Sequence, residues 1–167
     1  TQLGPFLVAP MRAVLAADVP IFSRSRSSGL KTLSRVDWVL ARSVATAVGA
    51  HEAIVCNEHG NVVCATAHNV FAVRNDLLRT PPLESGALPG VARGKILELA
   101  AELGLTVDDQ TPLSVTDLEA ADELFLSNSL TVLRPVGAFE SFGYPTGAVT
   151  RQLAKRLSAA IDLSTDG

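Results

Sequence analysis

Residues 29–42 read GLKTLSRVDWVLAR and contain the start of the first clear helix of the chain. Ser34, with Asp37 three residues later, is a capping-box-like beginning for that helix. Apolar residues then recur at helical spacing as far as Val48, and Gly49 is well placed to end the helix. Lys31 comes just before this helix, and a lone lysine in such a position is normally a solvated surface charge.

In the rest of the sequence, the pattern of apolar residues predicts short strands joined by hairpin turns, mixed with helices. The predicted strands are 14–16, 53–56, 62–65, 70–73, 77–80, 124–126 and 132–136. The predicted helices are 34–48, 91–103, a short one that begins at Thr116 with Glu119 as its capping partner, and 148–161. Hairpins mixed with helices favour an α+β domain over a doubly wound parallel sheet.

Length and composition exclude several classes of protein. The 167 residues correspond to about one domain, and with 47% apolar and 19% charged residues a sizeable core is expected. A formal net charge of −3 without a basic block argues against nucleic-acid binding. No apolar run approaches the roughly 20 residues of a membrane helix, and the pattern of the first residues does not predict a signal peptide.

The cysteines and histidines predict neither a disulfide framework nor a metal site. Cys56 and Cys64 are the two cysteines, too few for such a framework, so a reducing cytoplasm is the expected location. His51, His59 and His68 have no metal-ligand spacing among themselves or with either cysteine.

Three segments, taken in order, carry a family resemblance. The first is 29–42; the second is NVF at 69–71 with TPPL at 80–83 and GALPGVAR at 86–93; the third is ADELFLSNSL at 121–130 with RPV at 134–136. Together they closely resemble the class IV aminotransferase family, which includes branched-chain and D-amino-acid aminotransferases and aminodeoxychorismate lyase. The first and third segments look most like the lyase branch, and the resemblance covers roughly residues 5–160.

The resemblance implies a pyridoxal-phosphate cofactor held by Lys31 as a Schiff base. Lys31 would also be the base that moves the Cα proton, and we expect it on a strand. A phosphate dianion needs backbone N–H donors and a helix N-terminus, which the start of the helix at 91–103 would supply. The residues implied to contact the cofactor besides Lys31 are Cys64, Gly90, Val91, Ala92, Asn128 and Ser129.

Three departures from the family pattern have chemical consequences. The family's glutamate that pairs with the pyridine nitrogen falls on Cys64, and its phosphate-binding threonine falls on Ala92. The family's small N-terminal domain has no counterpart, so residues 1–167 are expected to be the cofactor-binding C-terminal domain, with 1–30 as the interdomain connection and first strands. With a neutral thiol beside it, the pyridine ring of the cofactor would be a weaker electron sink than with a carboxylate. An elimination that is driven by aromatisation tolerates a weaker sink better than a transamination does.

The function that the resemblance implies is a lyase of folate synthesis. It would convert 4-amino-4-deoxychorismate to 4-aminobenzoate and pyruvate, with this fragment inactive alone. A branched-chain or D-amino-acid aminotransferase and a non-catalytic domain that keeps the fold remain open alternatives. By resemblance the expected fold is that of the D-amino-acid-aminotransferase large domain, α+β, with a barrel-like sheet flanked by helices, and the expected assembly is a homodimer.

Overall fold

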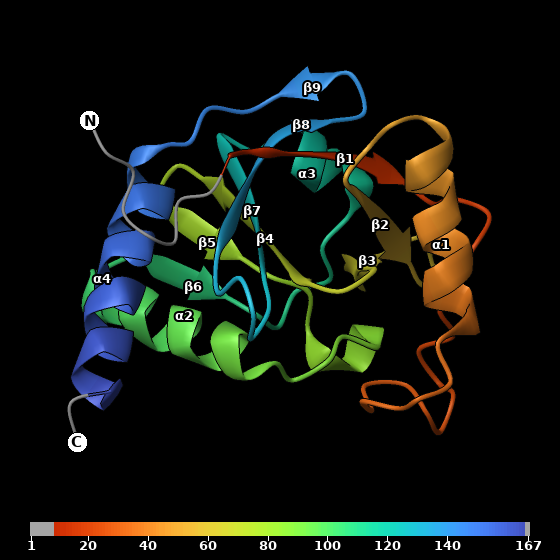
Figure 1. Cartoon of the computed structure of the whole chain (residues 1–167), viewed down its shortest axis with the longest axis horizontal. Helices are drawn as coiled ribbons and strands as arrows, with labels where there is room; N and C mark the ends of the chain where they lie inside the picture. Colours follow the sequence, from red (N-terminus) through yellow and green to blue (C-terminus); the bar gives the residue numbers. More distant parts are fainter. Residues whose placement is uncertain (1–8, 166–167) are drawn as a thin grey trace.

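The structure is a computed structural model that describes residues 9–165, with side chains up to residue 160, and Figure 1 shows one sheet with helices on either side. The strands are β1 (Met11–Leu15), β2 (Glu52–Cys56), β3 (Val62–Ala65), β4 (Asn69–Arg74), β5 (Leu77–Arg79), β6 (Thr106–Asp108), β7 (Glu123–Ser127), β8 (Arg134–Phe139) and β9 (Phe142–Gly143). The helices are α1 (Val36–Ala47), α2 (Val91–Glu102), α3 (Val115–Glu119) and α4 (Ala148–Thr165), with a 3-10 turn at Leu83–Ser85.

The sheet combines antiparallel hairpins with parallel crossovers. Its strand order is β3-β2-β1-β8-β7-β4-β5-β6, and β9 pairs with β8. The two predicted hairpins are present as β2–β3 and β4–β5. The pairs β1–β2, β1–β8 and β5–β6 are parallel, and α1 and α2 lie in the crossovers of the first and the last of these pairs, as parallel pairing requires a long connection. The predicted α+β class is confirmed.

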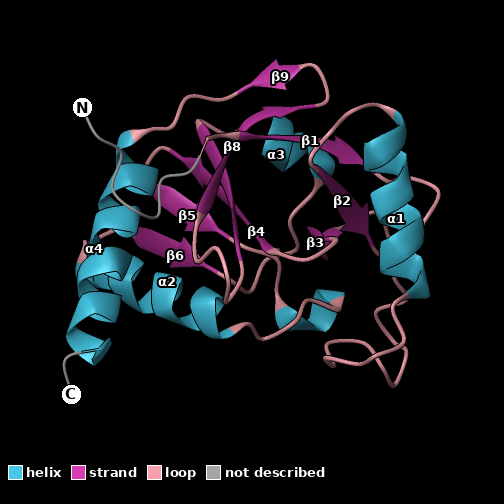
Figure 2. Ribbon diagram, in the orientation of Figure 1, coloured by secondary structure: helices cyan, strands magenta, loops and turns pink. Residues whose placement is uncertain are grey.

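The sheet is curled, as Figure 2 shows, and its interior is apolar. The end of β3 meets the start of β4 through the bridge between Ala65 and His68, and Val62 donates a backbone hydrogen bond to Leu113 beyond β6. One core cluster fills the inside of the curl against α3. A second lies between the sheet and α2 and α4 and contains the stacked rings of Phe71 and Phe125, whose centroids are 4.9 Å apart. A third lies under α1. The predicted barrel-like sheet is therefore confirmed as a curled half-barrel.

The N-cap of helix α1 lies one residue later than the sequence predicts. The N-cap is Arg35, without a side-chain hydrogen bond, so the capping box at Ser34 and Asp37 is wrong. Arg35 is held by tertiary contacts instead, since its guanidinium donates to the carbonyl of Thr66 at 2.6 Å. The predicted end of the helix is confirmed, with Gly49 in the left-handed region at φ 66°.

Other boundaries also differ from the predictions, among them those of β1, which begins at Met11 instead of residue 14, and of α4, which ends at Thr165 instead of residue 161. Helix α3 is capped by Ser114 in a capping box with Asp117, two residues before the predicted Thr116, whose hydroxyl instead contacts the Ser114 hydroxyl at 2.9 Å. The predicted strand 132–136 begins only at Arg134, because Val132 has a left-handed φ of 56° that breaks the extended backbone. Helix α2 ends as predicted, followed by Gly104 at φ 77°.

Helix α4 is attached to the sheet by a buried carboxylate. Glu123 at the start of β7 accepts hydrogen bonds from the backbone N–H groups of Val149 and Thr150, at 3.0 and 2.8 Å. These are unsatisfied donors at the beginning of the helix, so Glu123 caps it from a distant strand. A Cβ on Gly147 would overlap this carboxylate, which explains the glycine before the helix.

Among the helices of the described residues, none is both long enough and apolar enough to cross a membrane.

Candidate functional site

A cavity of about 410 Å³ opens where four parts of the fold meet. These parts are the loop before α1, the β3–β4 turn, the loop leading into α2 and the end of β7. The cavity brings together six of the seven residues predicted to form a site: Lys31, Cys64, Gly90, Ala92, Asn128 and Ser129. The seventh, Val91, does not line the cavity, because its side chain points outward and the residue is 82% exposed.

Lys31 lies in an irregular segment at the mouth of the cavity. We expected it on a strand, and this expectation is wrong: the segment before α1 has no partner strand, and Lys31 is exposed. The surrounding loop is nevertheless fixed at both ends. Ser23 donates to the Glu58 carboxylate through its backbone N–H and its hydroxyl, each at 2.9 Å, and Arg35 donates to Thr66.

The start of α2 faces the cavity with its backbone. Gly90 is the N-cap and provides no side-chain cap, so the first N–H groups of the helix have no side-chain acceptor there. Asn69 packs against Gly90 so closely that a Cβ there would overlap its side-chain oxygen, while its amide donates to the carbonyl of Leu88 at 2.8 Å. The close contact requires glycine and keeps the helix N-terminus against the floor of the cavity.

The end of β7 contributes hydroxyl and amide groups. Ser127 lines the cavity fully buried, and its hydroxyl has no hydrogen-bond partner among the described residues. Asn128 shapes the following turn, since its side-chain oxygen accepts from the N–H groups of Leu130 and Thr131 at 2.9 and 2.8 Å. Ser129 is exposed at the rim. The sequence predicted Asn128 and Ser129 but missed Ser127, although it belongs to the same Ser-Asn-Ser motif.

Cys64 is buried on β3 and lines the same cavity. Burial raises the pKa of its thiol to about 12, so the thiol is neutral at physiological pH. The charged side chains that line the cavity are those of Lys31 and Arg35, and no carboxylate among the described residues lines it. The cavity therefore combines positive groups with a neutral back wall, which suits an anionic ligand.

Residues 2–139 match the family described as Amino-transferase class IV. The chain belongs to the class IV aminotransferase family.

Class IV proteins of known name are similar to this chain in sequence and in structure. A Methanocaldococcus jannaschii protein provisionally named a branched-chain-amino-acid aminotransferase is 35% identical over 132 residues, 76% of this chain and 45% of that protein. The crystal structure of the Thermobaculum terrenum branched-chain amino acid aminotransferase in its pyridoxal-phosphate form matches 91% of this chain and 51% of that one, with a TM-score of 0.85 and 29% identity.

A lyase is also among the structural relatives of this class IV chain. The structure of a Legionella pneumophila protein provisionally named 4-amino-4-deoxychorismate lyase matches 90% of this chain and 56% of that one, with a TM-score of 0.85 and 26% identity. Relative to these proteins, the chain spans about half of the full length, from 45% to 56%.

Sequence reasoning missed a buried carboxylate beside the cavity of this class IV chain. Glu52 on β2 is fully buried and accepts hydrogen bonds from Thr66, His68 and Arg42. Burial works to raise the pKa of Glu52, but the hydrogen bonds from His68 and Thr66 and the charge of His68 outweigh it, so the pKa is lowered. Strand alternation alone gave no signal for Glu52, because β2 is buried on both faces.

The described residues contain no cluster of three His, Cys, Asp or Glu side chains that could hold a metal ion.

Proposed function

We propose that the chain is the large domain of a pyridoxal-phosphate-dependent enzyme and that Lys31 forms the covalent linkage to the cofactor. The observation that carries the proposal is the composition of the cavity: one amine, a helix N-terminus and strand-end hydroxyls converge there, with no carboxylate among the described lining residues. The aldehyde of such a cofactor needs the amine, and its phosphate needs the helix N-terminus and the hydroxyls.

The phosphate would lie between the start of α2 and the end of β7. The N–H groups of Val91 and Ala92 would donate to it, which leaves the side chain of Val91 free to point outward. Ser129, with Asn128 shaping its turn, would donate from the opposite side. The buried, unpartnered hydroxyl of Ser127 supports a polar ligand at this end of the cavity, because a buried hydroxyl without an acceptor is unfavourable.

Cys64 would face the cofactor ring as a neutral group. When bound, pyridoxal phosphate withdraws electrons from the carbon that carries the substrate amine, most strongly when its ring nitrogen is protonated. A thiol with a pKa of about 12 does not supply the negative charge that would hold that proton. The chain's own contribution is then Lys31, which would remove the proton from the substrate carbon and, in the elimination proposed below, deliver it to the enolpyruvyl group that leaves as pyruvate.

The specific reaction that we propose is the elimination of pyruvate from 4-amino-4-deoxychorismate to give 4-aminobenzoate. Formation of the aromatic ring drives this reaction, so it tolerates the weaker electron withdrawal that Cys64 implies. The likeness to the Legionella pneumophila structure supports the same branch. A branched-chain aminotransferase is the second candidate, favoured by the name of the Methanocaldococcus jannaschii relative. We also propose a cytoplasmic homodimer with a small-molecule substrate, in keeping with the family resemblance.

The test uses the complete gene product with pyridoxal phosphate. A yellow absorbance that borohydride reduces, with the label on the peptide containing Lys31, is expected in the unaltered protein. Lys31→Ala should lose the covalent adduct, whereas an undiminished adduct in that variant would contradict the assignment. Lys95→Ala is a matched control, because Lys95 is partly exposed on α2 and pairs with Glu98.

A second measurement separates the two candidate reactions. Transamination with an amino donor converts the cofactor to its amine form, and the absorbance changes without release of an aromatic product. Elimination leaves the cofactor in its aldehyde form and releases 4-aminobenzoate and pyruvate in equal amounts. Accumulation of the amine form with branched-chain amino acids, and no 4-aminobenzoate, would reject the lyase proposal.

A further inference from the structure

The buried carboxylate of Glu52 has no part in the chemistry proposed for the cavity. Glu52 lies on β2, is fully buried and does not line the cavity itself. Removing a charge from water costs free energy unless the charge is paired, and even a paired buried charge contributes little net stability. The hydrogen-bond partners of Glu52 indicate another reason for a carboxylate at this position.

Both oxygens of Glu52 accept hydrogen bonds from the turn at residues 66–68, which joins β3 to β4. Oε1 accepts from the hydroxyl of Thr66, and Oε2 lies 2.7 Å from Nδ1 of His68. Because a carboxylate only accepts, Nδ1 carries the proton, and this hydrogen bond does not require a charged ring. Thr66 and His68 are the first and last residues of the turn, so Glu52 holds the turn at both ends.

One side of the turn is attached to the segment that carries Lys31. The carbonyl of Thr66 accepts a hydrogen bond from the guanidinium of Arg35 at 2.6 Å. Arg35 is the N-cap of α1 and lies at the end of the irregular segment that contains Lys31. The position of Lys31 at the mouth of the cavity therefore depends on where the Thr66 carbonyl lies.

The other side of the turn is attached to the end of β7. The carbonyl of Ala67 accepts a hydrogen bond from the side-chain amide of Asn128 at 3.2 Å. The side-chain oxygen of Asn128 in turn accepts from the N–H groups of Leu130 and Thr131, which fixes the backbone around Ser129. The position of Ser129 at the rim of the cavity therefore depends on where the Ala67 carbonyl lies.

The two acceptors on the turn are backbone carbonyls, those of Thr66 and Ala67. A backbone carbonyl is present whatever the side chain of its residue, so only its position can vary. The side chains of Thr66 and His68, on either side of Ala67, are the groups that Glu52 holds. Glu52 therefore sets the position of both carbonyls.

We propose that Glu52 is a positioning residue of the cavity, which sets Lys31 and Ser129 at the correct separation by holding the turn between them. The proposal rests on the proposed function of the cavity, in which Lys31 holds the aldehyde and Ser129 the phosphate of one cofactor molecule. Groups that bind two ends of one molecule must match its length, and a small displacement of either group weakens binding. Removal of the Glu52 carboxylate should therefore impair both ends of the site together.

The test uses the complete gene product and two probes, each with one of the two groups of the cofactor. Pyridoxal has the aldehyde but no phosphate, and 4-deoxypyridoxine 5'-phosphate has the phosphate but a methyl group in place of the aldehyde. Glu52→Ala should weaken the binding of each probe by about tenfold or more, the loss expected when charge-assisted hydrogen bonds are removed. Glu52→Gln, which keeps one acceptor oxygen, should weaken both less. Absorbance titration measures pyridoxal binding, and calorimetry measures binding of the phosphate analogue.

The matched control is the removal of a second buried carboxylate, that of Glu123. Glu123 is also buried and accepts backbone hydrogen bonds, but it caps α4 and does not line the cavity. Glu123→Ala should lower the free energy of unfolding and leave the affinity for both probes unchanged. The same pattern in Glu52→Ala would show that Glu52 contributes to stability alone and would overturn the proposal.

Thr66→Val is a milder variant that tests the proposal even if Glu52→Ala does not fold. It removes the hydroxyl that donates to Glu52 and keeps the backbone carbonyl that accepts from Arg35. Both probes should bind more weakly to Thr66→Val than to the unaltered protein. Unchanged affinities in this variant, or a loss for one probe only in Glu52→Gln, would contradict a role for Glu52 at both ends of the site.

Hydrogen exchange in the protein without any probe separates this proposal from the proposed function. The peptides that contain Lys31 and Ser129 should exchange faster in Glu52→Gln and Thr66→Val than in the unaltered protein, and Glu123→Ala should not change them. Unchanged exchange in both peptides would overturn the positioning role even in a protein with the Lys31 linkage. Faster exchange together with absence of the Lys31 linkage in the unaltered protein would instead remove the proposed function and leave Glu52 as the residue that orders the cavity.

Discussion

Cys64 and Glu52 are both buried close to Thr66, and burial works to raise the pKa of each, yet their pKa values shift in opposite directions. Burial dominates at Cys64 and raises the pKa of the thiol to about 12. At Glu52 the donors from His68 and Thr66 more than compensate for burial, and the pKa is lowered. Hydrogen-bond donors around a buried carboxylate can therefore outweigh the effect of burial on its pKa. One wall of the site is a neutral thiol, and the next contains an ionised carboxylate.

Exchange of the thiol for a carboxylate tests the role of Cys64. If Cys64 faces the cofactor ring, Cys64→Glu in the complete gene product should retain the cofactor more tightly and gain transaminase side activity, with the fold unchanged. The reason is that the new carboxylate would pair with a protonated ring nitrogen. Cofactor release on dilution and the rate of conversion to the amine form are the measurements.

The neutral variant Cys64→Ser serves as the control and should change neither quantity. The opposite result is also informative. If Cys64 only packs in the hairpin, a partnerless buried carboxylate would destabilise the domain by several kcal/mol, as judged by urea unfolding. Loss of the folded state without a gain in cofactor binding would assign Cys64 to packing and weaken the argument for a lyase.

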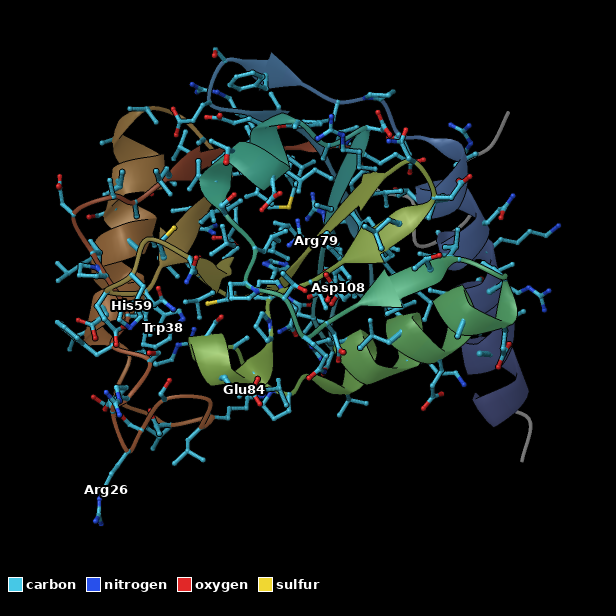
Figure 3. All side chains as sticks on the ribbon, turned by 180° about the vertical axis from the view of Figure 1, so that it is seen from behind. Arg26, Trp38, His59, Arg79, Glu84 and Asp108 are labelled. Atoms are coloured by element: carbon cyan, nitrogen blue, oxygen red, sulfur yellow. The ribbon has the colours of Figure 1, made fainter. Side chains whose placement is uncertain are left out.

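Glu52 makes stability depend on pH in the acid range. Its pKa in the folded protein is lower than the ordinary 4.5, so its contribution is fully present above about pH 4.5 and is lost as the pH falls through the folded value. Glu52→Gln should therefore flatten the decline of the free energy of unfolding below that pH. Urea unfolding at several pH values measures this, with the exposed Glu84 (Figure 3) changed to Gln as control. An unchanged slope in Glu52→Gln would contradict the prediction.

At the scale of elements, local signals in the sequence predicted the beginnings of α2 and α4 and the ends of α1 and α2, but not the beginnings of α1 and α3. Gly49 and Gly104 end their helices as expected, because a left-handed residue after a helix is a property of the glycine itself. The start of α1 was wrong because Arg35 is fixed by Thr66, 31 residues away. A contact between distant segments leaves no pattern in the neighbouring sequence.

Helix α4 offers a test of long-range capping. Gly147→Ala should destabilise the protein by about 1–3 kcal/mol, since the new Cβ would displace the Glu123 carboxylate from the N–H groups of Val149 and Thr150. Gly94→Ala is the matched control: it lies in α2 with open space around its Cα, and it should stabilise by roughly 0.5–1 kcal/mol. Thermal unfolding measures both. Equal effects of the two substitutions would show that Glu123 has no capping role.

For the molecule as a whole, the sequence motifs predicted which segments meet at the cavity, but not the neighbouring residues Glu52 and His68. Lys31, Gly90 and Ser129 were singled out because the order of three motifs resembles a family. Glu52 and His68 belong to no such motif. The parallel pairing of β1 with β8 joins segments that lie far apart in the sequence, and local sequence patterns do not indicate such pairing. The curl of the sheet depends on such long-range pairing, so local sequence patterns could not predict it.

The length of the chain leads to a prediction for its activity. Residues 1–167 cover about half of the related proteins, and orientation by groups from several segments can account for roughly 7–11 kcal/mol of a barrier in favourable cases. These residues expressed alone should therefore turn over 4-amino-4-deoxychorismate little or not at all, as measured by release of 4-aminobenzoate. Turnover at a rate typical of an intact enzyme, on the order of 10 per second, would refute the prediction.

The pairing of β1 with β8 determines when the domain can be completed during synthesis. Met11 pairs with Val136, so the central strand waits for a partner near the other end of the chain. At about 5–20 residues per second, the 124 residues from Leu15 to Phe139 (139 minus 15) take roughly 6–25 s to translate. During that time one edge of β1 has no partner, and an open strand edge is a template for aggregation. The nascent chain is therefore open to aggregation through β1 until β8 emerges.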